Sequence, residues 1–378
     1  MFTGPGLVFT RDGHCHVEGV AVDELTMGPG EVLVEVDVSV VNTDTEAANF
    51  VGGDRQLHDG GYPRRYPRRP SCAAVGHIVA LPRSSEMVDG YKVGDRVFAI
   101  CAHGRYAVAG PLDRPVVPLQ PDDDARTMVL ARTALAALTA VSKTSVAHVR
   151  KSAMVIGLGL VGNFAAQLLQ IAGMEVLGLD RSEHRVAMAT KVGLSALRVA
   201  EGGERDLLEQ DIGRSADFVV VASGVPDASP VAVALCRDGG DVVLLATPSG
   251  PFECDATKML AEVQRRGIRL LGTPLQSCRP RYSLRQDYLA LFRLFRDSRL
   301  RTSGLITDVV RPAEAHDIYG RLATRDPELG AVMFDWDDPG PALSSARHLS
   351  QWAGEGPTEF RTEVDHGDCQ RRTHSQPR

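Results

Sequence analysis

The chain has 378 residues, a formal net charge of −6 at pH 7, 43% hydrophobic residues and 24% charged residues. These values are typical of a globular protein with room for two domains and a sizeable core. The acidic balance argues against a nucleic-acid partner, no apolar run is long enough to cross a bilayer, and the first residues lack a signal-peptide pattern. We therefore expect a cytoplasmic protein that acts on a small molecule, without a nucleic-acid or membrane partner.

Cysteine usage indicates reduced thiols. The 7 cysteines are scattered and no two of them form a Cys-x-x-Cys pair, which argues against a disulfide framework. The segment His14-Cys15-His16 combines metal-ligating residue types. Neighbours on a strand point to opposite faces, however, so these residues do not readily share one ion. We expect no metal site there.

Residues 1 to about 130 are rich in valine, glycine and proline and show little helical periodicity. Residues 31–38 alternate acidic and apolar side chains after the turn Gly28-Pro29-Gly30, which is the pattern of a half-buried strand. Further strands are predicted at residues 75–80 and after the turn at residues 92–95. The N-terminal third is therefore expected to be a β domain.

The clearest functional motif lies in residues 153–180. A short apolar run leads into GLGLVG at residues 157–162, a helical pattern follows, and a second apolar run ends at Asp180. In such a strand-turn-helix, the glycines permit a tight turn, close approach of a pyrophosphate and packing of helix on strand. An acid about 20 residues further on accepts hydrogen bonds from the adenosine ribose, which favours NAD(H). Arg185 is expected over the adenine, and Arg181 leaves NADP(H) possible by offering a partner to a 2′-phosphate.

Three further apolar runs, at residues 217–224, 241–247 and 268–272, are separated by helical stretches, which predicts a parallel sheet with helices between its strands. The carboxyl ends of such strands meet at one edge of the sheet, where ligands bind. The predicted cofactor site comprises Gly157, Gly159, Leu160, Val161, Gly162, Asp180, Arg181, Arg185, Ala222, Gly224 and Thr247.

The C-terminal part contains mixed elements. Helices are predicted at residues 288–297 and 312–324, and strands at residues 305–310 and 330–335. Residues 339–378 are rich in Gly, Pro, Ser, Arg and His and have few apolar side chains. We expect them to form a mobile tail.

The order of these motifs resembles that of the medium-chain dehydrogenase/reductase superfamily. The matching stretches are GPGEVLVEV, KVGDRVFA, GLGLVG and GLITDVV. The resemblance implies an α/β protein with a GroES-like catalytic β domain at residues 1–132 and 281–338. It implies a Rossmann domain with a doubly wound parallel sheet at residues 133–280. It also implies an active site between the domains and a homodimer or homotetramer.

The zinc-dependent branch of this superfamily binds a catalytic metal through a cysteine, a histidine and a third ligand. At the corresponding positions this chain has Asn42, Cys72 and a residue near Arg132. Because a catalytic zinc needs three protein ligands, the resemblance implies an enzyme without zinc. Members of that branch also carry four closely spaced cysteines that bind a structural zinc. In this chain the interval between GDRV at residues 94–97 and the end of the domain contains only Cys101. The segment NTDTE at residues 42–46 is similar to zinc-free branches that contain bacteriochlorophyllide hydroxyethyl dehydrogenase-like proteins and quinone oxidoreductases.

Without a metal, the substrate oxygen needs a proton donor or acceptor from the protein. The resemblance places Asp44 where zinc enzymes keep a proton-relay hydroxyl, Tyr62 where zinc-free enoyl reductases keep a tyrosine, and His103 in the substrate pocket. Each residue also has a simpler structural interpretation. Asp44 would cap a loop, Tyr62 would pack on the surface, and His103 would be an exposed loop histidine without a function. Further substrate-pocket candidates are Asn42, Thr45 and Cys72.

Four arginines lie in the segment YPRRYPRRP at residues 62–70. They would either recognise a phosphate or carboxylate of the substrate or form an ordinary solvated surface. We predict a zinc-independent, nicotinamide-dependent oxidoreductase that interconverts a secondary alcohol and a ketone on a small polar or anionic molecule. One alternative is an enoyl or quinone reductase that uses Tyr62 as proton donor, and another is a non-catalytic NAD-binding protein.

Overall fold

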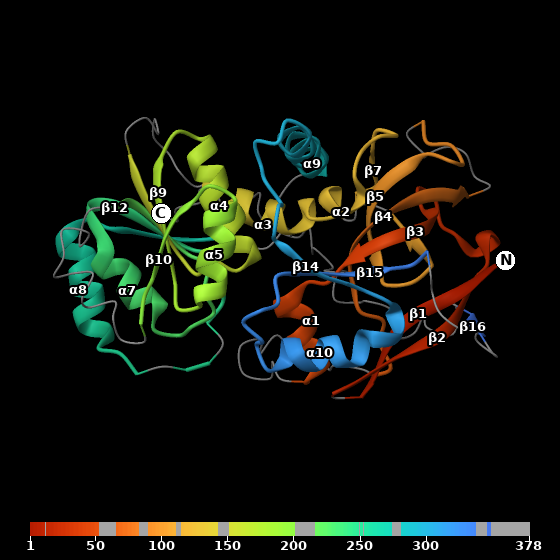
Figure 1. The fold of residues 1–378 in the computed structure, drawn as a ribbon, viewed down its shortest axis with the longest axis horizontal. Coiled ribbons are helices and arrows are strands. Elements are labelled where there is room, and N and C mark those ends of the chain that lie inside the picture. Colours follow the sequence, from red (N-terminus) through yellow and green to blue (C-terminus); the bar gives the residue numbers. More distant parts are fainter. Residues whose placement is uncertain are drawn as a thin grey trace, which may run out of the picture.

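The computed structural model describes residues 1–11, 13–52, 66–82, 90–110, 115–142, 151–200, 216–248, 250–251, 253–273, 281–337 and 346–348. Two halves lie side by side along the long axis, a β-rich half with the N-terminus and a half with a helix-covered sheet (Figure 1). Helices α2 (Ala125–Met128), α3 (Ala131–Val141) and α9 (Arg281–Arg296) lie between them. The predicted two-part α/β class is confirmed.

The helix-covered half is built on a six-stranded parallel sheet with the order β10-β9-β8-β11-β12-β13. Its strands are β8 (Ser152–Ile156), β9 (Glu175–Asp180), β10 (Ser195–Arg198), β11 (Ala216–Val221), β12 (Cys236–Leu244) and β13 (Arg269–Gly272). Its helices are α4 (Leu160–Ile171), α5 (Glu183–Lys191), α7 (Ala228–Leu235) and α8 (Ala256–Arg266). Because the first strand is central and later strands extend to both sides, the sheet is doubly wound.

Local signals set the bounds of two of these helices. Ser182 accepts a hydrogen bond from the backbone N–H of Arg185 at the start of α5, and Asp255 does the same for Lys258 at the start of α8. Both residues are therefore N-caps. Gly267 ends α8 with a φ of 64°, a left-handed conformation that favours glycine.

The β-rich half contains a seven-stranded sheet in which β14, β15, β3, β4, β5 and β7 follow in order and β6 pairs with β3. Its strands are β3 (Val32–Val40), β4 (Ser71–Ala80), β5 (Arg96–Ala102), β6 (Tyr106–Ala109), β7 (Val117–Pro118), β14 (Ile306–Val310) and β15 (Ala331–Asp335). The pairings are antiparallel except that of β14 with β15. The C-terminal part of the chain therefore returns to complete the first sheet.

A three-stranded sheet lies at the end of the β-rich half. There β1 (Phe2–Arg11) and β2 (His14–Val22) form an antiparallel hairpin, and β16 (Ala346–His348) pairs with β2 in parallel. The prediction of a mobile tail over residues 339–378 does not hold for β16. This segment is ordered as a strand because the edge of β2 offers unpaired backbone groups to it. The other tail residues lie outside the described ranges. Within β2, Cys15 is buried whereas both neighbouring histidines are exposed, as alternation along a strand requires.

Helices α1 (Thr43–Phe50) and α10 (Ala315–Ala323) pack against each other beside this sheet (Figure 1). The rings of Phe50 and Tyr319 stack with their centroids 5.6 Å apart. Two 3-10 turns complete the described elements of the β-rich half, at Glu24–Thr26 and Pro312–Glu314. The second turn forms the start of the helix predicted over residues 312–324, and α10 forms the rest.

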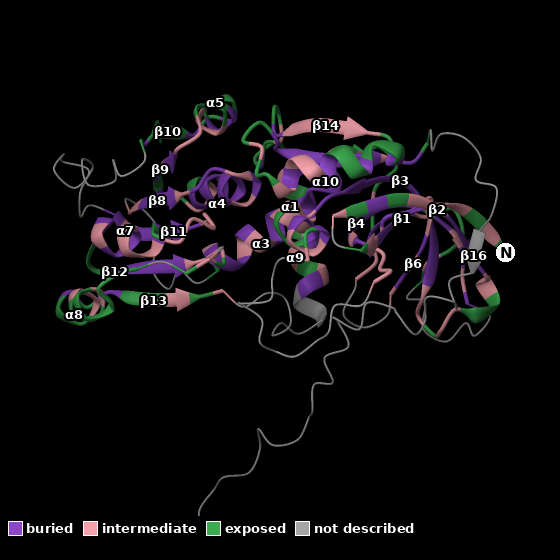
Figure 2. Ribbon diagram, turned by 90° about the horizontal axis from the view of Figure 1, so that it is seen from below, coloured by how far each residue is buried: buried purple, intermediate pink, exposed green. Residues whose placement is uncertain are grey.

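One hydrophobic cluster joins the two halves. It includes Val40 and Cys72 of the β-rich half together with Leu158 and Phe164 of the helix-covered half. All four side chains are buried, and the central strands of the helix-covered half are buried with them (Figure 2). The same cluster contains residues of α3 and α9, the helices that lie between the two halves. Among the described helices, none is long and apolar enough to span a membrane.

Candidate active site

The turn after β8 needs glycine for two different reasons. Gly157 has a φ of 93°, and a Cβ on Gly162 would lie 1.8 Å from the carbonyl oxygen of Gly157. Gly159 is different, because a Cβ there would find no atom closer than the Nη1 of Arg185 at 4.0 Å. The first and third glycines are thus required for the turn and its packing, whereas the second faces open space that a ligand can enter.

Asp180 closes β9 beside this turn. One carboxylate oxygen accepts a hydrogen bond from the backbone N–H of Leu158 at 2.7 Å, and the other accepts from the backbone N–H of Ser182 at 2.8 Å. The side chain of Asp180 is 7% exposed, and the Nη1 of Arg185 lies 4.0 Å from Oδ2. Each oxygen keeps a second lone pair, so this fixed carboxylate can still accept a hydrogen bond from a ligand.

The other predicted cofactor residues lie at the same edge of the sheet. Leu160 is the first residue of α4 and is buried, and Val161 follows it half-buried. Ala222 donates its backbone N–H to Ile156 at 2.9 Å directly after β11. Gly224 is half-buried after the same strand, and Thr247 is exposed after β12. The structure therefore gathers these positions around the carboxyl ends of β8, β9, β11 and β12.

This edge fits a dinucleotide. The N-terminus of α4 presents backbone N–H groups to anions such as a pyrophosphate. The Nε of Arg185 is buried and has no hydrogen-bond partner. Arg181 differs, because its guanidinium lies 3.4 Å from the carboxylate of Asp227. The residues present supply donors for phosphates and an acceptor for a ribose, which are the groups that such a cofactor carries.

A second set of residues meets at one end of the seven-stranded sheet. The end of β3 pairs with the start of β4 through Val40 and Ala73, and the start of β4 pairs with the end of β5 through Ser71 and Ala102. Helix α1 begins soon after β3. The predicted site residues Asn42, Cys72 and His103 therefore lie at the same end of the sheet. They come from three segments of the sequence.

A chain of buried polar side chains extends from this end. His103 is fully buried, and its Nδ1 lies 2.7 Å from the Oγ of Ser39 while its Nε2 lies 3.1 Å from Glu46 Oε2. The same carboxylate oxygen accepts from the hydroxyl of Tyr319 at 2.5 Å. The indole N–H of Trp336 donates to Ser39 Oγ at 2.8 Å. We call these five residues the Glu46 network.

The hydrogen-bond chemistry of the Glu46 network is consistent with the following proton positions. An indole N–H can only donate, so Ser39 must accept from Trp336, and its own hydroxyl hydrogen is free to point to His103 Nδ1. Nδ1 is then an acceptor, and the hydrogen of a neutral His103 sits on Nε2, which donates to Glu46. A neutral imidazole with its hydrogen on Nε2 satisfies each of these contacts. Burial next to that carboxylate raises the pKa of Tyr319 well above its ordinary value.

Glu46 also holds the first turn of α1. Its Oε1 accepts a hydrogen bond from the backbone N–H of Asn42 at 2.7 Å. Asp44 and Thr45 lie on that turn and are exposed, so the buried carboxylate at this site is Glu46 rather than Asp44. His103 is neither an exposed loop residue nor open to a small molecule in this arrangement. Tyr62, the third predicted proton carrier, lies outside the described residues.

Cys72 is a buried thiol at this end of the sheet. Burial raises the pKa of the Cys72 thiol to about 12, and the nearby Glu46 carboxylate also raises it, whereas Arg132 of α3 opposes the shift. Cys72 is 5% exposed, so it is a packed side chain and not a reactive thiolate. Within the described residues, no group of three or more His, Cys, Asp or Glu side chains has the geometry of a metal site.

Glu46, Tyr319, Ser39 and Trp336 are the members of the Glu46 network that the sequence does not single out. One local signal exists for Glu46. An asparagine followed four residues later by glutamate, just before an apolar helix face, suggests a side chain that returns to the first turn. Nothing local indicates that Tyr319, which lies far away in the sequence, donates to the same carboxylate.

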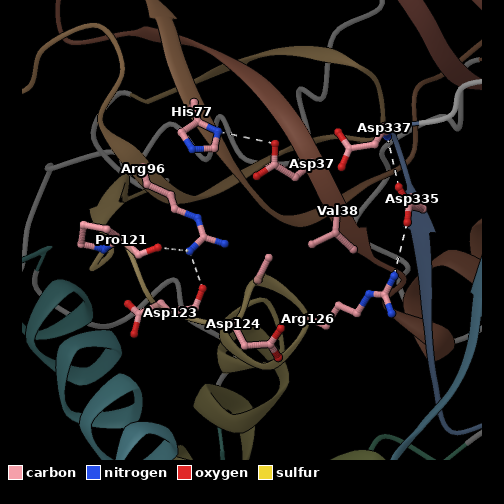
Figure 3. A pocket seen from close by; sticks show the side chains of 11 residues that line it. Asp37, Val38, His77, Arg96, Pro121, Asp123, Asp124, Arg126, Asp335 and Asp337 are labelled. Carbon is pink, nitrogen blue, oxygen red and sulfur yellow. Dashed lines mark hydrogen bonds and ion pairs between the residues drawn. The ribbon is translucent and has the colours of Figure 1, made fainter.

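One hollow of the described surface is separate from both sets. A cavity of about 490 Å³ lies between β3, β5, β15 and α2 (Figure 3). It is lined mainly by aspartates, and partners sit beside several of them: Arg126 next to Asp335 and Arg296 next to Asp123. Its walls contain neither the Gly157 turn nor Cys72 and His103. We regard it as a set of ion pairs that ties these elements together, and not as the active site.

Family models match most of this chain. The model "Alcohol dehydrogenase GroES-like domain" matches residues 28–165, and the model "Zinc-binding dehydrogenase" matches residues 161–293. Among characterised relatives, a 2-desacetyl-2-hydroxyethyl bacteriochlorophyllide A dehydrogenase of Cereibacter sphaeroides is 26% identical over 82% of this chain and 91% of its own length. An L-threonine 3-dehydrogenase of Symbiobacterium thermophilum is 30% identical over 32% of this chain and 35% of its own length.

Solved structures share the fold at low sequence identity. A galactitol-1-phosphate dehydrogenase of Escherichia coli has a TM-score of 0.73 at 17% identity, over 88% of this chain and 99% of its own. A dehydrogenase of Sinorhizobium meliloti with bound NADP has a TM-score of 0.71 at 17% identity, over 89% of this chain and 100% of its own. An Escherichia coli alcohol dehydrogenase with bound NADH has a TM-score of 0.69 at 15% identity, over 88% of this chain and 99% of its own.

Proposed function

The chain belongs to the medium-chain dehydrogenase/reductase superfamily of oxidoreductases, and we propose that it interconverts a secondary alcohol and a ketone with NAD(H) and without zinc. The observation that carries the proposal is the turn at Gly157 beside Asp180. Gly159 faces space that a ligand can enter, and two backbone N–H groups hold the carboxylate of Asp180 in place. A bound nicotinamide supplies or accepts the hydride.

The electrostatics of the turn favour NAD(H) over NADP(H). The Asp180 carboxylate suits the hydroxyl groups of a ribose, and it repels the additional phosphate of NADP(H). Arg181 is the residue that would bind that phosphate, but it is paired with Asp227 at 3.4 Å. Arg185 lies beside the open face of Gly159 and its Nε has no partner, so it is the arginine that we assign to the adenine side of the cofactor.

The proposal of zinc independence rests on the donor set. At the three positions where zinc-dependent members carry ligands, this chain offers the amide of Asn42, the thiol of Cys72 and the neighbourhood of Arg132. A guanidinium does not bind zinc, so Cys72 is the one soft donor at these positions, whereas a catalytic zinc needs three protein ligands. These groups do not fit a catalytic zinc, and no step of the reaction is assigned to one.

Protein side chains then have to handle the proton. We assign the exchange with the substrate oxygen to Asp44, because it is exposed on the first turn of α1 and a carboxylate can act as acid or base. The Glu46 network holds this turn through Asn42, so His103 and Glu46 position the acid and do not contact the substrate. Asn42, Thr45 and Cys72 remain the proposed neighbours of the substrate.

A deuterium-transfer experiment tests this function. The protein is incubated with NADH deuterated at the transferring position of the nicotinamide and with a panel of ketones, enones and quinones, and products are analysed by mass spectrometry. We expect deuterium on the carbinol carbon of an alcohol. Deuterium on the β-carbon of a saturated ketone would establish the enoyl reductase alternative instead. Bound NADH without transfer to any panel member would contradict both.

We further propose a homodimer or homotetramer that acts in the cytoplasm on a small molecule. Strand β13 supports the assembly, because it is the last strand of its sheet and Leu270 on it is 37% exposed. An edge strand with an exposed apolar side chain is a natural partner for a second copy. Light scattering coupled to size-exclusion chromatography measures the mass, and a monomer at micromolar concentration would refute this assembly.

A further inference from the structure

Arg69 is a half-buried arginine that makes no ion pair with a carboxylate of the described residues. Its Nη2 donates one long hydrogen bond, 3.3 Å, to the carbonyl oxygen of His103. Its Nε is inaccessible to solvent and has no hydrogen-bond partner. None of the ion pairs of the described residues includes it. Burial lowers the pKa of Arg69 to about 10, and the only group that opposes this shift is the Cys101 thiol.

Two other arginines that are withdrawn from solvent lie beside acids. Arg266 is 4% exposed and contacts the carboxylate of Asp238 at 2.7 Å. Arg296 makes two hydrogen bonds of 2.7 Å to the carboxylate of Asp123. This pairing is the rule, because a buried charge without a partner destabilises the folded state by several kcal/mol. Arg69 differs from both, because none of the carboxylates of the described residues contacts it.

The backbone is shaped around this side chain. A Cβ on Gly104 would lie 2.7 Å from Nη2 of Arg69, and a Cβ on Gly6 would lie 3.1 Å from it. The two glycines pair with each other as an isolated antiparallel bridge between β1 and the turn after β5. The guanidinium therefore occupies a space that side chains at either glycine would fill. Nη2 of Arg69 therefore packs against this bridge.

Arg69 lies next to the proposed substrate site. It is three residues before Cys72, and the carbonyl that it contacts belongs to His103 of the Glu46 network. Cys101, whose thiol it influences, is the strand partner of Cys72. Of the other three arginines in the YPRRYPRRP segment, Arg64 and Arg65 lie outside the described residues, and Arg68 has a partner of its own.

We propose that Arg69 binds an anionic group of the substrate, a carboxylate or a phosphate. The inference rests on the proposed oxidoreductase function for the identity of the ligand, and on the geometry of Arg69 for the site. Nε and Nη2 lie on one edge of the planar guanidinium, which matches the two oxygens of a carboxylate or phosphate. The substrate class is therefore a hydroxy or keto acid, or a phosphorylated alcohol or ketone.

Anion binding is tested first, in the full chain and without any redox reaction. The unfolding temperature is measured against increasing acetate or inorganic phosphate at constant ionic strength, for the wild type, Arg69→Gln and Arg69→Lys, with Arg68→Gln as the matched control. We expect the anion to raise the unfolding temperature of the wild type and of Arg68→Gln, to raise that of Arg69→Lys less, and to leave Arg69→Gln unchanged. The anion that acts at the lower concentration distinguishes carboxylate from phosphate.

Equal responses in the wild type and Arg69→Gln would overturn the proposal. If Arg69→Gln does not fold, the comparison of the wild type with Arg69→Lys decides in the same way, because lysine keeps the charge and loses the two-point contact.

A kinetic comparison then links the site to catalysis. NAD-dependent oxidation of 3-hydroxybutyrate is compared with that of 2-butanol, which has a similar carbinol and no carboxylate. We expect Arg69→Gln to raise KM for the acid about tenfold or more, as expected for loss of a charge-assisted contact, and to leave 2-butanol unchanged. An equal change for both alcohols would contradict the assignment. If neither alcohol is oxidised, these substrates fail as probes of the redox function, whereas the anion titration still decides on Arg69.

Discussion

The hydroxyl of Tyr319 offers a sharp test of the Glu46 network. Tyr319 is 0% exposed, and its O–H···O contact to Glu46 is 2.5 Å long. Replacing it with phenylalanine removes this hydrogen bond and keeps the ring, whose contacts with Phe9 at 4.8 Å and Phe50 at 5.6 Å remain. Because the acceptor is the buried carboxylate of Glu46, Tyr319→Phe should lower the free energy of unfolding by about 1.5–3 kcal/mol.

Urea unfolding followed by circular dichroism measures this loss. The matched control is Tyr106→Phe, since Tyr106 also donates to a carboxylate, that of Glu35, but at 3.3 Å and at a half-buried position. We expect the control to lose no more than about 1 kcal/mol. The interpretation of the network as a charged, buried chain is refuted if Tyr319→Phe costs no more than Tyr106→Phe.

The same residue gives a pH dependence with a defined sign. The pKa of Tyr319 is raised in the folded protein well above its ordinary value of 10.0, so the unfolded chain loses this proton first as the pH rises. The contribution of Tyr319 to stability is therefore complete below pH 10.0 and is lost above it. The difference in free energy of unfolding between the wild type and Tyr319→Phe should narrow as the pH rises above this value. A difference that stays constant there would contradict the shift.

Three further predictions concern the cofactor turn and the thiols. Gly162→Ala should abolish NADH binding or folding, because its Cβ would lie 1.8 Å from the Gly157 carbonyl oxygen, and NADH fluorescence and the unfolding temperature report each loss. Asp180→Asn should weaken NADH binding about tenfold and lower the ratio of the affinity for NADH to that for NADPH, both measured by calorimetry. Cys254, which is exposed, should be alkylated by iodoacetamide at neutral pH well before the buried Cys72, whose thiol pKa is raised to about 12, as peptide mass spectrometry would show.

Each of these predictions has a result that counts against it. Tight NADH binding by Gly162→Ala at an unchanged unfolding temperature would show that the turn relaxes more than its packing suggests. An unaltered ratio of NADH to NADPH affinity in Asp180→Asn would remove the acid from cofactor selection. Modification of Cys72 as fast as Cys254 would mean that the thiol is reached by solvent and forms a thiolate.

The sequence was sufficient for the dinucleotide half because each of its signals is local. The valine-rich runs are buried parallel strands, and GLGLVG with Asp180 lies within one strand-turn-helix-strand unit. The third glycine is required by a contact with Gly157, five residues away in the same turn. Patterns of this length can be interpreted without knowing the rest of the fold.

The Glu46 network could not be predicted because its members meet only in the folded chain. Glu46 bonds to His103, which is 57 positions away, and to Tyr319, which is 273 positions away. Asp44 has the same chemistry as Glu46 and lies two residues before it, and the local spacing of Asn42 and Glu46 does not indicate the bonds to His103 and Tyr319. The helical period of α1 places Glu46 on the buried face and Asp44 on the exposed one.

The measurement that tests the central claim most directly is the activity of the protein as a function of its metal content. Protein purified with and without chelator is assayed with NADH and a ketone that it reduces, and bound zinc is determined by elemental analysis of the same samples. We predict equal turnover at every zinc content, including samples in which zinc is far below one ion per chain. Turnover that rises in proportion to bound zinc would contradict the account.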